Sequence, residues 1–155
     1  MRVVVTDAER LTKMTVNEPE FIGHVELRLL RSSHYEIINT FAFRSPSLNL
    51  EIKIYPGFQT IFDNIPRIPG IHALLKGRAE LSAIVHDIIY RLGILDDRTF
   101  TRKEADVVME EAMRAEKINA FYRYCIYLGI RIGGWYFWNK YRSGQWEPGL
   151  EVDPY

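Results

Sequence analysis

The first half of the chain alternates apolar and polar positions, which is the pattern of half-buried β-strands. Three such alternations run over residues 21–30, 35–43 and 48–54. Because successive side chains of a strand point to opposite faces, a period of two predicts that one face of each strand is buried. Short polar connections such as Ser45-Pro46-Ser47 fit antiparallel pairing. The pattern therefore predicts a small antiparallel sheet that ends at Tyr55-Pro56-Gly57.

The second half changes to a period of 3.6, which is the pattern of amphipathic helices. Apolar residues recur at this spacing over residues 81–92, and Gly93 is expected to end that helix. A second helix is predicted to begin at Thr101, because Thr101 and Glu104 match a capping box. Its expected core face is made of Ala105, Val108, Met109, Ala112 and Met113. A last, long helix is predicted over residues 118–139.

These elements predict one α+β domain that spans residues 1–155. The β-rich part covers residues 1–56, an irregular crossing covers 57–77, the helical part covers 78–140, and an extended tail covers 141–155. The chain has 47% apolar and 26% charged residues, as an ordinary globular domain does.

Charge and cysteine content narrow the possible partners and compartments. The 20 basic and 20 acidic residues cancel, so we expect no specific nucleic-acid partner. Cys125 is the single cysteine, so an internal disulfide is impossible, and we expect it to be a small core residue. The most apolar stretch contains Arg123 and Arg131, and the first residues hold only a short apolar run. We therefore expect neither a transmembrane segment nor a signal peptide, and a cytosolic location.

The most specific local motif is the string His86-Asp87-Ile88-Ile89-Tyr90. On a helix, His86 and Tyr90 share one face, whereas Asp87 is rotated away from it. Histidine suits general-base catalysis near neutral pH, and it needs a partner that fixes its tautomer. Asp106 lies at the edge of the second helix's apolar stripe, where a carboxylate needs a donor. We therefore predict a hydrogen bond between His86 and Asp106, which serves either catalysis or a structural role.

Other catalytic or metal-binding patterns are missing from the sequence. His24, His34 and His72 are isolated and show no ligand spacing, so we expect no zinc site. The chain has neither a glycine-rich phosphate loop nor the GxSxG motif of serine hydrolases.

The predicted last helix carries more large aromatic side chains than one helix face can bury. We therefore expect part of them to form an interface with another chain, and the expected interface residues are Tyr122, Trp135, Tyr136 and Trp138. Gly129 and the pair Gly133-Gly134 are expected to weaken this helix.

Several motifs follow one another in a characteristic order. They are Gly57-Phe58-Gln59-Thr60, Ile65-Pro66-Arg67, the string from Ala83 to Tyr90, Thr101 to Asp106, Ala112-Met113, and Arg131 to Trp135. Over residues 52–138 their order and spacing resemble the domain of unknown function 1353, a family widespread in tailed bacteriophages and prophages. The resemblance implies further site residues, which are Gly57, Thr60, Asp63, Pro66 and Arg67. Where the family pattern has an aspartate after the threonine, this chain has Ile61, and Asp63 is the candidate to replace it.

A helix with His-Asp-x-x-Tyr, next to an aspartate on a second helix, is also similar to the active site of phospholipase A2. This resemblance implies that His86 activates water, that Asp106 orients His86, that Tyr90 supports the pair, and that Asp87 binds calcium. The chain lacks the glycine-rich calcium loop and the disulfides of those enzymes.

Two functions follow as expectations, and the sequence leaves open whether the protein is an enzyme. The first is a bacteriophage-encoded virion or assembly component, which uses no cofactor and binds other phage proteins or itself. It would reside in the host cytoplasm and could enter the virion. The second is a small hydrolase acting on lipid or envelope, with His86 as general base and calcium as cofactor. Ile61 and the missing calcium loop favour the first.

Overall fold

The computed structural model describes residues 3–7, 18–31, 34–61, 79–95 and 98–143. The strands are β1 (Val3–Asp7), β2 (Glu20–Ile22), β3 (Leu27–Arg31), β4 (His34–Ile37), β5 (Phe41–Ser45), β6 (Leu50–Ile54), β7 (Gln59–Ile61), β8 (Ile94–Leu95) and β9 (Arg98–Thr99). The helices are α2 (Glu80–Leu92), α3 (Arg102–Ala115) and α4 (Ala120–Arg142). Predictions for most of the crossing (62–78) and for the tail from residue 144 lie outside the described residues.

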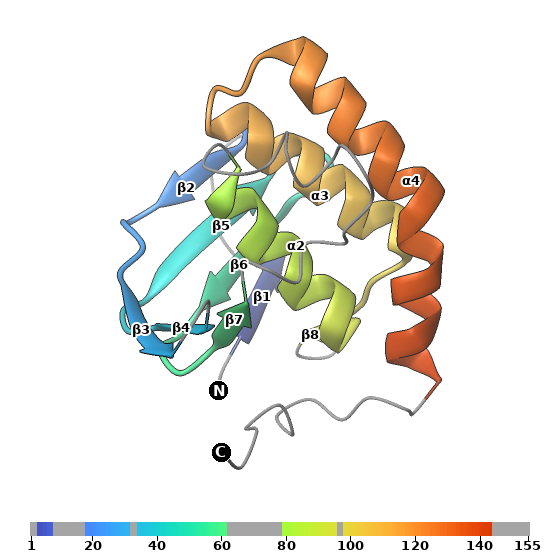
Figure 1. Cartoon of the computed structure of the whole chain (residues 1–155). Helices are drawn as coiled ribbons and strands as arrows, with labels where there is room; N and C mark the ends of the chain where they lie inside the picture. The colour runs from blue at the N-terminus through green and yellow to red at the C-terminus, as the bar shows by residue number, and fades with distance from the viewer. Residues whose placement is uncertain (1–2, 8–17, 32–33, 62–78, 96–97, 144–155) are drawn as a thin grey trace.

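Strands β1 to β7 form two antiparallel sheets, and helices α2, α3 and α4 follow these sheets in the chain (Figure 1). A short hairpin of β8 and β9 lies between α2 and α3. The first sheet has the strand order β1-β6-β5-β2, and the second has the order β3-β4-β7. All pairs are antiparallel, and β8 pairs with β9 in the hairpin. The predicted α+β class is therefore confirmed, with two main sheets where the sequence predicted one.

The alternation over residues 35–43 is not a single strand, and that prediction is wrong. It breaks at residues 38–40 into β4 and β5, which belong to different sheets. The Asn39 side chain causes the break, because its amide donates to the carbonyl of His24 (2.5 Å) and its oxygen accepts from the Glu26 amide (2.8 Å). An asparagine that bonds backbone groups competes with the ladder of a strand.

The sheet region does not end at Gly57, as the sequence predicted. Gly57 has a φ of 98°, which favours glycine, and the chain turns back there. The amide of Ile37 donates to the carbonyl of Phe58 (2.9 Å), and the amide of Gly57 donates to the carbonyl of Ile37 (2.8 Å). The turn thus places β7 beside β4, with which it pairs. Strand β1, which the sequence analysis did not identify, completes the other sheet beside β6.

The three predicted helices are confirmed, with shifts of two or three residues at the ends of α4. Helix α2 ends at Gly93, whose φ of 64° is left-handed, as a glycine C-cap requires. Helix α3 begins with the predicted capping box, in which Thr101 accepts from the Glu104 amide and Glu104 accepts from the Thr101 amide. Its five predicted core residues are all buried.

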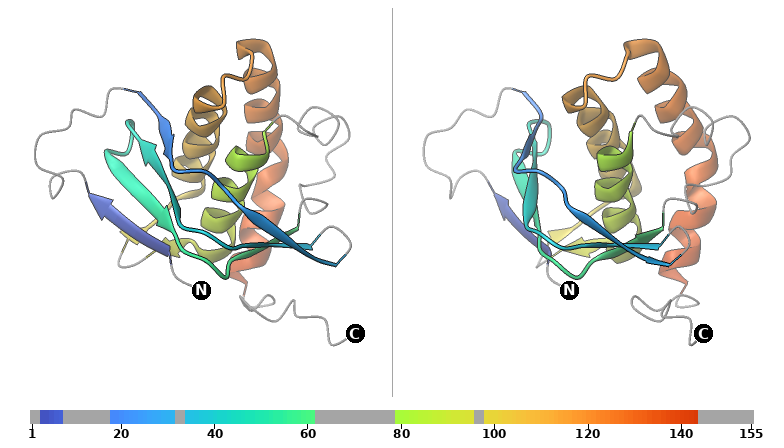
Figure 2. Two further views of the ribbon diagram at one scale, coloured as in Figure 1. Left: turned by 90° about the vertical axis from the view of Figure 1, so that its left-hand side faces the viewer. Right: turned by 60° about the vertical axis from the view of Figure 1, so that its left-hand side comes forward.

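The helices lie in two layers on one side of the first sheet (Figure 2). Helices α2 and α3 pack on the sheet, and their apolar faces share a core with Phe41, Phe43, Leu50, Ile52 and Ile54. A second cluster, with Met109 and Met113 opposite Ile126 and Ile130, joins α3 to α4. Helix α4 therefore forms the outer layer, with one side on α3 and the other side directed away from the sheet.

A buried carboxylate fixes α3 to the first sheet. Glu111 is 2% exposed and accepts hydrogen bonds from the hydroxyls of Ser45 and Ser47 (both 2.5 Å) and from the Ser47 amide (2.9 Å). Because a buried carboxylate is costly without donors, these bonds define the position of α3 along the sheet.

Candidate functional site

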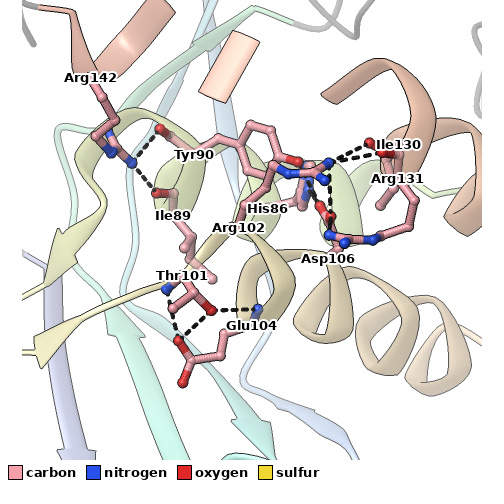
Figure 3. Close-up of polar contacts among 10 residues, drawn as sticks. All are labelled: His86, Ile89, Tyr90, Thr101, Arg102, Glu104, Asp106, Ile130, Arg131 and Arg142. Carbon is pink, nitrogen blue, oxygen red and sulfur yellow. Dashed lines mark hydrogen bonds and ion pairs between the residues drawn. The ribbon is translucent and has the colours of Figure 1, made fainter. Parts of the chain in front are cut away.

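Asp106 on α3 is the centre of a buried polar network between the three helices (Figure 3). Its side chain is fully buried. One oxygen, Oδ1, accepts from His86 Nε2 (3.1 Å) and from the Tyr90 hydroxyl (2.6 Å). The other oxygen, Oδ2, accepts from Arg131 Nη1 (2.6 Å) and lies 3.6 Å from Arg102 Nη1. The predicted hydrogen bond between His86 and Asp106 is therefore confirmed.

The network keeps Asp106 ionised. Burial acts to raise the pKa of Asp106, but hydrogen bonds from His86 and Tyr90 and the interactions with His86 and Arg131 outweigh it, so the pKa is lowered. Burial, together with the hydrogen bond to Asp106, raises the pKa of the Tyr90 hydroxyl far above its ordinary value. Tyr90 thus stays a protonated donor. A buried carboxylate is stable in this arrangement, because each of its oxygens accepts at least one hydrogen bond and arginines balance its charge.

The two arginines are members of the site that the sequence analysis did not assign. Arg102 precedes Asp106 by four residues, which places both on one face of α3. Arg102 also donates to the carbonyl of Arg131 (3.0 Å), so it links α3 to the backbone of α4. The spacing of four residues between Arg102 and Asp106 could have identified Arg102 from the sequence. Arg131, in contrast, contacts Asp106 only because α4 packs on α3.

Gly134 allows the network to form. A Cβ at this position would lie 2.5 Å from the Tyr90 hydroxyl oxygen, closer than real Cβ contacts allow. Gly134 is buried, and the helix is continuous across it. The sequence predicted that Gly133 and Gly134 weaken α4. In the structure Gly134 also has a packing role, since only glycine lets α4 approach α2 at Tyr90.

Both ends of α2, the helix that carries His86, are capped by charged side chains from other elements. Glu116, which follows α3, accepts from the amides of Leu81 (3.3 Å) and Ser82 (3.0 Å) and from the Ser82 hydroxyl. Arg142 at the end of α4 donates to the carbonyls of Tyr90 (2.9 Å) and Arg91 (3.2 Å). A carboxylate at the N-terminus and a guanidinium at the C-terminus match the helix dipole. Helix α2 is therefore fixed at both ends as well as at its middle.

The residues around Asp87 do not fit the calcium site that the phospholipase resemblance implies. Asp87 Oδ1 accepts from Arg91 Nε (2.9 Å), four residues along α2. The guanidinium of Arg91 already neutralises this carboxylate and opposes a divalent cation beside it. Among the described residues, no group of three or more His, Cys, Asp or Glu side chains could hold a metal ion.

The further site residues implied by the first resemblance divide into two groups. Gly57 forms the turn before β7, and Thr60 on that strand is buried at 3% exposure. Neither is among the residues bonded to Asp106. Asp63, Pro66 and Arg67 lie outside the described residues.

The predicted interface residues on α4 differ in exposure. Trp135 and Tyr136 are 56% and 55% exposed. Tyr122 is half-buried against the α3–α4 cluster, and Trp138 packs edge-on against Tyr90 with ring centroids 5.2 Å apart. The outward apolar surface of α4 has further exposed members that were not among the predicted interface residues, which are Phe121, Tyr124, Leu128 and Ile132. Their spacing of three and four residues was the available signal.

The fold and the network define an α+β domain built around a buried histidine–aspartate pair. A family model described as "Protein of unknown function (DUF1353)" matches residues 35–130. The match covers more than half of the chain, so the chain belongs to this family. Neither the curated proteins nor the solved structures gave a match.

The structure gives a physical reason for three of the motifs that carry the family resemblance. His86 and Tyr90 come from one motif, Arg102 and Asp106 from the next, and Arg131 from the last. All of them meet at the Asp106 carboxylate. Motifs far apart in the sequence therefore describe one three-helix contact.

None of the helices in the described part of the chain is long and apolar enough to span a membrane.

Proposed function

We propose that this chain is an assembly component encoded by a bacteriophage or prophage, present in the host cytoplasm and incorporated in the particle. In this function the Asp106 network is a scaffold, and the outward side of α4 binds a protein partner. The observation that carries the proposal is the row of exposed apolar side chains on α4, from Phe121 at 69% exposure to Trp135 at 56%. Contiguous exposed apolar surface of this kind is characteristic of interaction sites. The family resemblance supports the phage origin.

The contacts of Asp106 support a scaffold role for the histidine–aspartate pair. Its carboxylate is shared among three hydrogen-bond donors, His86, Tyr90 and Arg131, and a fourth partner, the guanidinium of Arg102, which together come from all three helices. A catalytic carboxylate needs only to orient its histidine, whereas this one joins α2, α3 and α4 to one another. The caps at both ends of α2 further restrict its movement relative to α3 and α4. Helix α4 is therefore held in a fixed position on the other two helices.

Mass spectrometry of purified virions from the encoding phage tests the proposal. We expect the chain at a fixed copy number per particle. A phage carrying Leu128→Arg, on the exposed side of α4, should lose the chain from its particles or assembly intermediates. Leu29→Arg is the matched control, because Leu29 is 60% exposed on β3 and Leu128 is 45% exposed. Absence of the wild-type chain from both particles and assembly intermediates would overturn the proposal.

A second candidate function is a small hydrolase that uses His86 as a general base. One observation favours it: Nε2 of His86 is bound to a buried carboxylate, and no hydrogen bond from the described residues reaches Nδ1. A histidine held in this way has one nitrogen available for a proton from water. The shared use of Asp106 by two arginines and the pairing of Asp87 with Arg91 favour the scaffold.

Release of fatty acid from phospholipid vesicles separates the two candidates. The wild-type protein and His86→Asn are compared with and without added calcium, and the melting temperature of each is measured. The scaffold role predicts no release by either protein and a lower melting temperature for His86→Asn. Release by the wild type that is lost in a folded His86→Asn variant would establish the hydrolase instead.

A further inference from the structure

The outward side of α4 carries a row of large apolar side chains with symmetric spacing. Phe121, Tyr124, Leu128, Ile132 and Trp135 are separated by three, four, four and three residues, so they follow one line along the helix. All five are exposed. The spacing is the same in both directions from Leu128. In the following paragraphs these five residues, together with the exposed Tyr136, are called the α4 stripe.

A symmetric row is self-complementary when two copies of α4 lie antiparallel. With a two-fold axis at Leu128, each Leu128 meets its equivalent, Tyr124 meets Ile132, and Phe121 meets Trp135. A two-fold interface requires this property, because the same patch must serve both partners. Spacings of three and four residues are also those of helix–helix seams.

The size of the α4 stripe fits an interface between two chains. The exposed fractions of its six side chains lie between 45% and 69%. With ordinary side-chain areas these fractions correspond to about 700 Å² of exposed surface. A standard protein interface buries about 800 Å² on each partner, so the stripe supplies nearly the whole area that a stable dimer needs.

The charges of α4 are held away from the α4 stripe. Within the segment spanned by the stripe, the charged residues are Arg123 and Arg131. Arg123 donates to Glu110 on α3 (3.0 Å), and Arg131 donates to Asp106 (2.6 Å). Two stripes can therefore meet without placing an unpaired charge between them, which is a costly feature of poor interfaces.

We propose that the occupant of the α4 stripe is a second copy of this chain, packed antiparallel across a two-fold axis at Leu128. The inference deepens the proposed function and rests on its claim that this side of α4 binds a protein. The assembling unit is then a dimer, whose two sheets lie on opposite sides of the paired α4 helices.

Light scattering during size-exclusion chromatography tests the dimer with the full chain. We expect a mass of twice 18.2 kDa at a protein concentration of about 100 μM, where a dimer with a micromolar dissociation constant is mostly associated. Leu128→Arg places two arginines against each other on the axis and should weaken the dimer at least about 100-fold. The control Leu29→Arg should remain dimeric. A wild-type chain that stays monomeric, or a dimer that Leu128→Arg leaves intact, overturns the inference.

Charge complementation tests the antiparallel pairing. Tyr124→Glu alone and Ile132→Lys alone should each be monomeric, because each buries an unpaired charge, and both positions are exposed enough to leave folding intact. An equimolar mixture of the two variants should form a heterodimer, since the introduced carboxylate of one chain then meets the introduced ammonium group of the other. Native mass spectrometry identifies the mixed species. Failure of the mixture to associate overturns the antiparallel arrangement.

The experiments distinguish this inference from the proposed function. If the chain is monomeric but Leu128→Arg still removes it from particles, the dimer is wrong and the docking role of α4 stands. If the chain is monomeric and sediments with vesicles of anionic phospholipid through the α4 stripe, both the dimer and the protein partner are wrong.

Discussion

The contact between Gly134 and Tyr90 gives the sharpest test of the buried network. In Gly134→Ala the new Cβ would lie 2.5 Å from the Tyr90 hydroxyl oxygen, whereas 3.4 Å is the lower limit of an ordinary contact. One of the two groups must therefore move by nearly an ångström. The hydroxyl is held 2.6 Å from Asp106, so such a movement lengthens or bends that hydrogen bond.

Two opposing free-energy terms decide the sign of this substitution. Replacing glycine by alanine inside a helix stabilises the folded state by about 1 kcal/mol. Loss of a hydrogen bond to a charged group costs about 1.5–3 kcal/mol. We therefore expect Gly134→Ala to lower the free energy of unfolding by about 0.5–2 kcal/mol. For a chain of this length, that corresponds to a fall in melting temperature of about 2–6 °C.

The matched background is Tyr90→Phe, which removes the hydroxyl and leaves the ring. The closest remaining ring atom is then Cζ at 3.4 Å from the added Cβ, an ordinary contact. In this background Gly134→Ala should stabilise the protein by about 1 kcal/mol, because only the helix-propensity term remains. The substitution thus changes sign with the background, and the coupling energy of the double-mutant cycle is about 1.5–3 kcal/mol.

Urea unfolding followed by circular dichroism measures all four proteins of the cycle. Equal effects of Gly134→Ala in the two backgrounds, of either sign, would refute the reasoning, because they would show that the hydroxyl of Tyr90 is not what the new methyl group meets.

Substitutions at three carboxylates, Asp106, Glu116 and Glu111, give the remaining tests. Asp106→Asn should cost about 3 kcal/mol at pH 7, because two arginines lose the charge that neutralises them. The lowered pKa of Asp106 gives stability that is present above the pKa of an unfolded aspartate and is lost as the pH falls through the folded-state pKa. Unfolding free energies measured from pH 7 down to about pH 2 should therefore fall less steeply for Asp106→Asn than for the wild type, and equal slopes would contradict this. Glu116→Ala removes the cap of α2 and should cost about 1–2 kcal/mol in urea unfolding, whereas Glu116→Gln, which keeps an acceptor, should lose less. Glu111→Ala should cost about 1–3 kcal/mol, because it leaves the buried Ser45 hydroxyl without its acceptor, and a neutral result would show that α3 is positioned by apolar contacts alone.

The sequence by itself determined the elements whose signals are local. The capping box at Thr101 and the glycine stop at Gly93 depend on residues within one helical turn, so they could be identified without tertiary structure. The same is true of the buried faces of α2 and α3. The pairing of His86 with Asp106 was also predictable, because both side chains lie on the inward side of neighbouring helices and a buried carboxylate needs a donor.

Tertiary structure decided what depends on contacts between distant segments. The alternation over residues 35–43 continues without interruption in the sequence, yet Asn39 binds the segment at residues 24–26 and divides it between two sheets. The pairing of Arg131 with Asp106, the role of Gly134, and the separation of the outward Trp135 from the inward Trp138 follow from how α4 lies on α3 and α2. Helical periodicity gives the faces of a helix, but packing alone determines which neighbour each face meets.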